Sequence, residues 1–143
     1  MVYPDRNVVA IAGDGGFMMN SQELETAVRL NLNIVVIIIN DKAFGMIKWK
    51  QAGMGFPNFG MDMTNPDFVK LAEAYGCVGL ACDSPEDVDA TITKAMEIND
   101  VPVVVDFRVH RDAMVWPMVA AGTSNDEIKY ARDMAPKFDE DDL

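Results

Sequence analysis

A short glycine-rich segment carries one acidic side chain at a point where a buried strand is followed by a helical pattern. It is Gly-Asp-Gly-Gly at residues 13–16, directly after the apolar stretch 8–12. Glycines let a ligand approach the main chain closely, and amides at a helix start favour an anion such as phosphate. The Asp14 carboxylate would repel that phosphate unless a cation bridged them. The segment therefore suggests that Asp14 holds Mg²⁺ and that Mg²⁺ holds a diphosphate.

This interpretation requires a second oxygen ligand from a neighbouring strand, and Asn40-Asp41 follows the apolar stretch 34–39. If the two stretches are adjacent parallel strands, their carboxyl ends place Asp14 beside Asn40 and Asp41. A Gly-Asp-Gly segment alone is more often a tight turn, so the pair is the more specific signal. The segment is neither the dinucleotide fingerprint, because the third glycine is missing, nor a P-loop, because no Gly-Lys-Ser/Thr follows.

The elements that would position these residues alternate along the chain. Strands are predicted at 7–13, 33–40, 77–82 and 101–109, the first two being of the buried type. Helices are predicted at 20–31, 43–51, 66–75 and 85–98, and a further helix within 124–134. Asn20 is a candidate N-cap with Glu23 three residues on, Pro66 a candidate first helical residue after Asn65, and Gly76 a stop signal.

This alternation predicts the α/β class, a parallel sheet with helices on both faces. The 143 residues are expected to form one domain, with the α/β part at residues 1–110. Residues 111–143 are expected to be an irregular or helical acidic tail packed on or beyond it.

Composition excludes several classes of function. The formal net charge of −11 argues against binding to nucleic acid, which needs a basic surface. No apolar run approaches the roughly 20 residues of a membrane helix, and the first residues lack the layout of a signal peptide. Cys77 and Cys82 are expected to be core thiols in a reducing compartment, which predicts a cytoplasmic location.

The two polar segments and their flanks resemble a known family. Gly13-Asp14-Gly15 followed about 24 residues later by Asn40-Asp41 resembles the thiamine diphosphate motif of thiamine-dependent decarboxylases and carboligases. The stretch GDGGFMMNSQELETAVRLNLNIVVIIINDKAFGMIKWKQ is similar to acetolactate synthases almost throughout. NPDFVKLAEAYG and VWPMVAAGTSN resemble later segments of the same family. The resemblance covers nearly the whole chain and implies the thiamine diphosphate-binding fold, specifically its diphosphate-side domain.

The resemblance implies roles for particular residues. Mg²⁺ would be held by the Asp14 and Asp41 side chains and the Ala43 carbonyl. Thiamine diphosphate would lie against this cation and the glycine segment. The implied cofactor-binding residues are Gly13, Asp14, Gly15, Gly16, Asp41, Ala43, Gly45 and Met46.

Two features differ from the usual family pattern. The common pair is Asn-Asn, whereas this chain has Asn40-Asp41, and the added charge should make cofactor binding more dependent on the metal. Biosynthetic members carry a tryptophan at the position of Lys50, whereas Trp49 stands one place earlier, as an aromatic residue does in catabolic members. The late VWPMV segment resembles biosynthetic members, so the acceptor, pyruvate or 2-ketobutyrate, stays open.

In the family, the complete enzyme condenses two 2-ketoacids with loss of carbon dioxide, in branched-chain amino acid or acetoin pathways. Family chains are much longer: a first domain supplies a catalytic glutamate and a middle domain often binds FAD. The resemblance therefore implies that this chain works with missing N-terminal domains or a second chain, in a homo-oligomer, and carries no catalytic residue. His110 is expected to be structural, and Trp49, Met46 and Met54 either line a substrate entry or simply pack.

Three alternatives stay open. The chain could be a catalytically silent cofactor-binding fragment, or another thiamine diphosphate-dependent decarboxylase or oxidase. The third is a receiver-like α/β module with Asp14 as its acidic site. It is disfavoured because the clustered acids and the lysine of such modules are missing.

Overall fold

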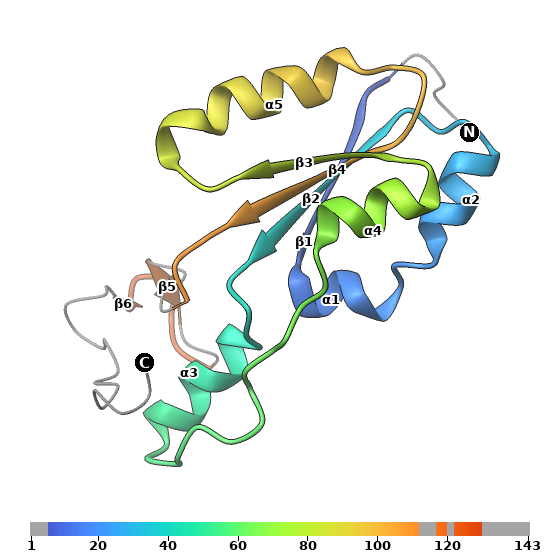
Figure 1. Ribbon diagram of the computed structural model, residues 1–143. Coiled ribbons are helices and arrows are strands. Elements are labelled where there is room, and N and C mark those ends of the chain that lie inside the picture. Colours follow the sequence, from blue (N-terminus) through green and yellow to red (C-terminus); the bar gives the residue numbers. More distant parts are fainter. Residues whose placement is uncertain (1–5, 112–116, 120–121, 130–143) are drawn as a thin grey trace.

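A four-stranded parallel sheet forms the centre of the fold. The computed structural model describes residues 6–111, 117–119 and 122–129. The strand order is β1-β2-β4-β3, and every neighbouring pair is parallel (Figure 1). The strands are β1 (Val8–Gly13), β2 (Ile34–Asn40), β3 (Val78–Cys82) and β4 (Val103–Arg108). All four predicted strands are confirmed.

Helices cover both faces of this sheet, as the alternating pattern predicted. One face carries α1 (Asp14–Met19), α2 (Glu23–Arg29) and α4 (Phe68–Tyr75), and the other carries α5 (Val88–Glu97), which follows a short 3-10 turn at Pro85–Asp87 (Figure 1). Each face has its own apolar core. Phe17, Leu24 and Phe68 pack against β2 and β4 on the first face. Ala95 packs with Val103 and Val105 on the second.

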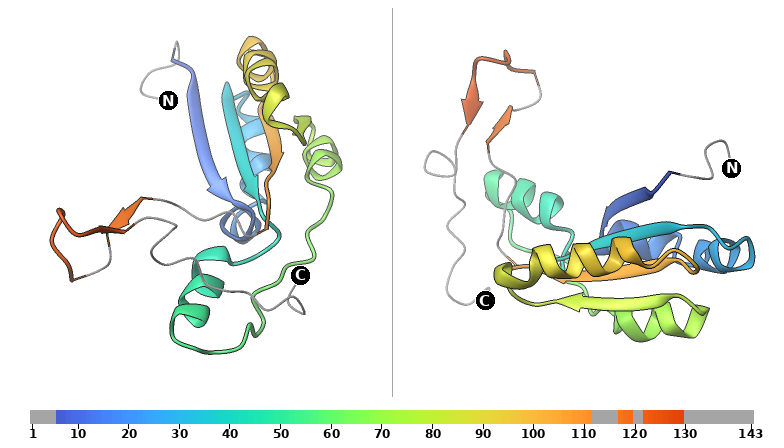
Figure 2. Two further views of the ribbon diagram at one scale, coloured as in Figure 1. Left: turned by 90° about the vertical axis from the view of Figure 1, so that its left-hand side faces the viewer. Right: turned by 90° about the horizontal axis from the view of Figure 1, so that it is seen from above.

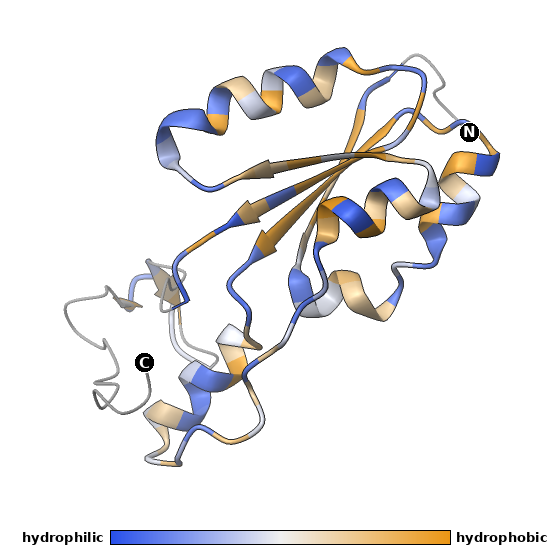
Figure 3. Cartoon of the chain, viewed as in Figure 1, coloured by the Kyte–Doolittle hydropathy of each residue, from blue (hydrophilic) through white to orange (hydrophobic). Residues whose placement is uncertain are grey.

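The apolar character of the strands fits a sheet that is covered on both faces. Figure 3 shows that the strands are predominantly apolar. Ile38, Val103, Val104 and Val105 are at most 1% exposed. Continuous β-branched runs of this kind suit a parallel sheet that is covered on both sides.

The first strand differs from its prediction as a buried strand. β1 lies at the edge of the sheet, and the exposed fractions of Val9 and Ile11 are 43% and 71%. The apolar run alone could not reveal this, because a strand at an edge and one at the centre can share the same composition. The prediction of a buried strand was therefore wrong for β1 and right for β2.

Two predicted helix starts were also wrong. The chain enters α1 directly from β1, and Asn20 is the C-terminal cap of α1, whereas α2 begins at Glu23. The helix α4 begins at Phe68, two residues after Pro66, and its N-cap is Asp67, whose carboxylate accepts a hydrogen bond from the Lys70 N–H. Gly76 ends α4 in the left-handed conformation, with φ of 89°, as expected.

The segment after β2 forms α3 (Gly45–Gly53) and a long loop that returns to α4. Figure 2 shows α3 beyond the end of the main sheet toward which the strands point. The loop pairs with the residues before α3: the Phe44 N–H donates to the Met61 carbonyl at 2.8 Å, and the Met63 N–H donates to the Lys42 carbonyl at 2.8 Å. These two bonds flank Ala43 and pair residues 42–44 with residues 61–63 in an antiparallel bridge.

Beyond the main sheet, β5 (Met118–Val119) and β6 (Ile128–Lys129) pair as a small antiparallel sheet. The helix predicted within 124–134 is wrong for 124–129, which contain a turn and β6, and residues 130–134 lie outside the described residues. Most of the acidic tail lies outside them too, so the boundary at residue 110 stays a prediction.

Cys77 and Cys82 are both buried, free thiols, which agrees with the expectation of core residues. They belong to the cores on opposite faces of the sheet. Within the described residues, no helix has the length and apolarity needed to cross a bilayer.

Candidate functional site

The carboxyl ends of β1 and β2 bring the two predicted polar segments together. Gly13 is the register partner of Ile39, so Asp14 and Asn40 follow at neighbouring positions of the same sheet edge. Asp14 is 2% exposed and Asn40 is 5% exposed. This juxtaposition is the one that the sequence predicted. It is notable because an ionisable side chain is rarely buried unless it is paired or binds a ligand.

Asp41 is the second acidic group of this edge, and it interacts directly with Asp14. Burial raises the pKa of Asp41 above its ordinary value. The negative charge of Asp14 and the hydrogen bond between the Asp14 and Asp41 carboxyl groups raise the pKa of Asp41 further. The hydrogen bond from the Ala43 N–H lowers the pKa of Asp41. Two carboxyl groups in such proximity are stabilised by a shared proton or by a cation.

Asn65, from the loop before α4, completes the cluster, and sequence analysis assigned it no functional role. Its Nδ2 donates to Asp14 Oδ2 at 2.6 Å and to Asn40 Oδ1 at 2.9 Å. Its Oδ1 is buried without a hydrogen-bond partner. The only sequence signal was its position before Pro66, where a helix cap was expected. The position therefore indicated a helix start rather than a site.

A row of hydrogen bonds continues from this cluster across the sheet edge. Asn40 Nδ2 donates to Asp106 Oδ1 at 2.9 Å, and Arg108 Nε donates to Asp106 Oδ2 at 3.0 Å. The Arg108 guanidinium also pairs with Asp83 at 3.1 Å. Asp106 is 2% exposed, and the arginine supplies the opposite charge that a buried carboxylate needs.

The glycines of the two segments differ in what surrounds them. A Cβ on Gly45 would lie 2.5 Å from Asp41 Oδ2, and a Cβ on Gly15 would lie 2.5 Å from the Phe44 ring. By contrast, a Cβ on Gly13 or Gly16 would have no heavy atom within 4 Å. Gly45 therefore allows Asp41 to pack closely, and Gly15 allows the Phe44 ring to do so, whereas Gly13 and Gly16 face open space.

Ala43 lies in a fixed turn next to this cluster. It is 4% exposed, and its N–H donates to Asp41 Oδ1 at 3.1 Å. Lys42 before it has a φ of 56°, an uncommon conformation for a residue with a side chain. The paired loop described above stabilises this turn.

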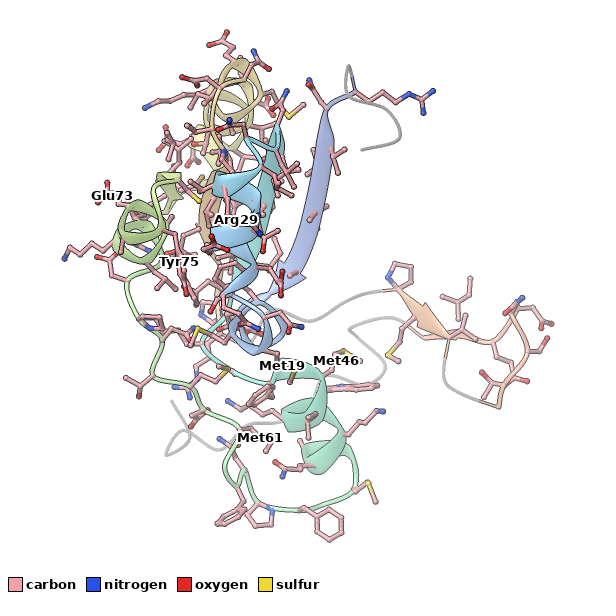
Figure 4. The ribbon with its side chains drawn as sticks, turned by 90° about the vertical axis from the view of Figure 1, so that its right-hand side faces the viewer. Met19, Arg29, Met46, Met61, Glu73 and Tyr75 are labelled. Atoms are coloured by element: carbon pink, nitrogen blue, oxygen red, sulfur yellow. The ribbon has the colours of Figure 1, made fainter. Side chains whose placement is uncertain are left out.

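The remaining predicted residues lie outside the cluster. Met46 and Met54 are 49% and 70% exposed. They therefore do not pack in the core, which was one of the two roles that the sequence left open for them. Figure 4 shows Met46 at the start of α3, on the side nearest α1. Trp49 is partly buried on α3. His110 is exposed and lines a separate cavity of about 420 Å³ at the ends of β3 and β4.

The donor set fits a hard divalent cation. Two carboxylates converge at the carboxyl edge, and open glycine positions lie beside them. Mg²⁺ commonly takes one or two protein carboxylates and completes its octahedron with phosphate oxygens and water. In the described part of the chain, no group of three or more His, Cys, Asp or Glu side chains could hold a metal ion. Any cation at this edge would therefore take its remaining ligands from the main chain, phosphate or water.

Comparison with known sequences identifies the family of most of the chain. The family described as "Thiamine pyrophosphate enzyme, C-terminal TPP binding domain" matches residues 1–107. An acetolactate synthase large subunit from Mycobacterium tuberculosis is 49% identical over 96% of this chain, and one from Corynebacterium glutamicum is 45% identical over 97%. The large subunit of acetolactate synthase isozyme 3 from Escherichia coli is 36% identical over 90%. The chain spans about 23% of the length of each.

Solved structures share the same fold. The thiamine diphosphate-dependent 4-hydroxybenzoylformate decarboxylase of Rhodococcus jostii superimposes with a TM-score of 0.69 and 30% identity, over 75% of this chain and 20% of the decarboxylase. Thiamine diphosphate and thiamine pyrophosphate (TPP) are the same compound. Since the family pattern covers three-quarters of the chain, this protein belongs to the thiamine pyrophosphate enzymes, as their C-terminal TPP-binding domain.

Proposed function

We propose that this chain is the diphosphate-binding part of an acetolactate synthase and holds TPP through Mg²⁺. The Asp14 and Asp41 side chains and the Ala43 carbonyl bind the cation. The diphosphate lies along the Gly15-Gly16 segment, where the Gly16 amide meets it while the Gly15 N–H donates to Asp14 Oδ1. The supporting observation is that the Asp14 and Asp41 carboxyl groups meet at the carboxyl edge of the sheet, where an uncompensated pair is unfavourable.

In this proposal the chain binds and orients TPP, and none of its residues transfers a proton. TPP, when bound, supplies the reactive carbon that adds to a 2-ketoacid. Asp14 and Asp41 neutralise the diphosphate through the cation, and Gly13 and Gly16 leave room for the ligand beside the main chain. The turn at Ala43 fixes the third ligand, since the loop pairs with both residues flanking it.

The relatives support an activity for the whole enzyme. The identity of 45–49% to acetolactate synthase large subunits supports condensation of pyruvate with a second 2-ketoacid. The acceptor, the pathway, a cytoplasmic location, a homo-oligomer and FAD in the full-length enzyme stay predictions. In this proposal, the groups that transfer protons come from other domains or from a partner chain.

Calorimetric titration of the chain with TPP, with and without Mg²⁺, tests this function. We expect binding with Mg²⁺ and at least about tenfold weaker binding when the metal is chelated, a difference of about 1.4 kcal/mol. Equal binding in EDTA would contradict the cation bridge. Absence of binding by the folded chain at saturating Mg²⁺ would contradict the proposed function.

A second prediction follows from the space around Asp41. Gly45→Ala places a methyl group at a position 2.5 Å from Asp41 Oδ2, so the flexible carboxylate must move while the main chain stays. We expect the affinity for TPP in the presence of Mg²⁺ to fall about tenfold or more, in the range seen when groups that orient a metal ligand are changed. Fluorescence titration with TPP measures this loss.

Gly53→Ala is the matched control, because it lies on the same helix and a Cβ there meets nothing within 4 Å. It should bind TPP as the wild type does. If both variants bind equally well, then the clearance around Asp41 has no role in holding the cation.

A further inference from the structure

Asn65 occupies a position that links the two sides of the cation site. It precedes α4 and lies 51 residues after Asp14 and 25 after Asn40, yet one nitrogen contacts both, at 2.6 Å and 2.9 Å. The loop that ends at Asn65 is the same loop that pairs with residues 42–44. This segment therefore touches the site through both its main chain and a side chain.

The orientation of the Asn65 amide is determined by its neighbours. Asn40 Nδ2 donates to Asp106 Oδ1 at 2.9 Å, so Asn40 Oδ1 remains as the acceptor that faces Asn65. Turning the Asn65 amide over would place its oxygen against two other acceptor oxygens, those of Asp14 and Asn40. Only the arrangement with Nδ2 toward both is favourable, and it uses both N–H groups of the amide.

These bonds restrain the Asp14 carboxylate at both of its oxygens. The Gly15 N–H donates to Oδ1 at 2.8 Å, and Asn65 donates to Oδ2 at 2.6 Å. The main-chain donor belongs to the next residue and restricts only one oxygen. Asn65 is therefore the side chain that determines how Asp14 faces its neighbour Asp41.

We propose that Asn65 is a positioning residue of the cation site: it holds Asp14 in the orientation in which Asp14 and Asp41 share one divalent cation. This inference rests on the proposed function, because it assumes the same cation. Residues that hydrogen-bond to a metal ligand commonly change metal affinity by about 10–100-fold when they are removed. Asp106 supports Asn65 indirectly, since it orients Asn40.

The test is a titration of TPP binding against Mg²⁺ concentration for the wild type, Asn65→Ala and Asn58→Ala. Asn58 is the matched control, an asparagine of the same loop that bonds to Asp62 Oδ2 at 3.3 Å instead. We expect Asn65→Ala to raise the Mg²⁺ concentration for half-saturation about 10–100-fold, with TPP affinity restored at saturating Mg²⁺. Asn58→Ala should leave that Mg²⁺ concentration within about twofold of the wild type, well below the effect of removing a group that orients a metal ligand.

Electron paramagnetic resonance with Mn²⁺ provides a direct readout of the cation. The fraction of free Mn²⁺ in the presence of TPP should rise for Asn65→Ala and stay unchanged for Asn58→Ala. Asn65→Ser, which keeps one donor on a shorter side chain, should give a smaller rise and replaces the alanine variant if that variant fails to fold.

Two outcomes would overturn the proposal. One is a half-saturating Mg²⁺ concentration for Asn65→Ala within about twofold of the wild type, far below the expected range. The other is a loss of TPP affinity that saturating Mg²⁺ does not restore, which indicates a purely structural role. A wild type that binds TPP equally well without metal instead refutes the proposed function, so the two failures are distinguishable.

Discussion

Replacing Asp14 by alanine is expected to remove cation-dependent TPP binding from an otherwise folded protein. Asp14 is the buried carboxylate of the site, and its loss leaves the cation with a single protein carboxylate. We expect affinity for TPP in Mg²⁺ to fall by more than about 100-fold, beyond the range for residues that only orient a ligand. Calorimetric titration with TPP at saturating Mg²⁺ measures the change.

The variant also loses an acceptor for two donors, the Gly15 N–H and Asn65 Nδ2. Unpaired buried donors cost about 1–3 kcal/mol. The ligand-free variant should therefore unfold at a lower temperature than the wild type but remain folded at about room temperature, because this cost is smaller than the roughly 5–15 kcal/mol that typically stabilises a domain. Asp83→Ala is the control, since Asp83 follows another strand at the same sheet edge and bonds to Arg108 instead. Retained Mg²⁺-dependent binding in Asp14→Ala would exclude Asp14 as a cation ligand.

Replacing Phe68 by alanine is expected to have the largest effect on stability. Phe68 is 1% exposed, and its ring meets the Phe17 ring edge to face at a centroid distance of 5.5 Å. Truncating a buried phenylalanine costs about 3–5 kcal/mol, a large fraction of the 5–15 kcal/mol that typically stabilises a domain. Urea unfolding followed by circular dichroism should show a lower midpoint.

Phe59→Ala is the matched control, because Phe59 is 80% exposed on the loop before α4. Its midpoint should change little. If Phe68→Ala lowers the free energy of unfolding by less than about 1 kcal/mol, well below the range for a buried ring, then the packing of α1 against α4 does not depend on this contact.

The sheet was largely predictable because its central strands carry a composition that few other structures allow. The runs in β2 and β4 are continuous and β-branched, which suits a strand covered on both faces. Composition could not show that β1 lies at an edge. It also could not give the order β1-β2-β4-β3, because pairing depends on contacts between distant segments.

Local rules failed where tertiary contacts outweighed them. Two adjacent glycines are poor helix formers, and the predicted helix began only at residue 20. Instead α1 includes them, because Phe17 packs against Phe68 and so stabilises the turn. Likewise Asn65-Pro66 matched a helix start, yet Asp67 is the cap and Asn65 bonds to Asp14.

Within the site, the polar residues at the ends of the first two strands were predictable, and the residues that bond to them were not. Asp14, Asn40 and Asp41 each stand at the carboxyl end of an apolar stretch, so chain order was enough to place them at one edge. Asn65 and Asp106 come from other parts of the chain, and nothing in their flanks shows that they reach this edge. A single sequence reveals residues at strand ends more readily than the residues that hold them.

The position of β4 has a consequence for synthesis of the chain. This strand is the last of the four in sequence, yet it lies between β2 and β3 and pairs with both. During translation, β3 therefore cannot join the sheet until β4 has been synthesised, that is, up to residue 108. Such late long-range pairing slows folding. Asp106 belongs to that strand, so ribosome-bound chains that end before it lack the carboxylate to which Asn40 Nδ2 donates.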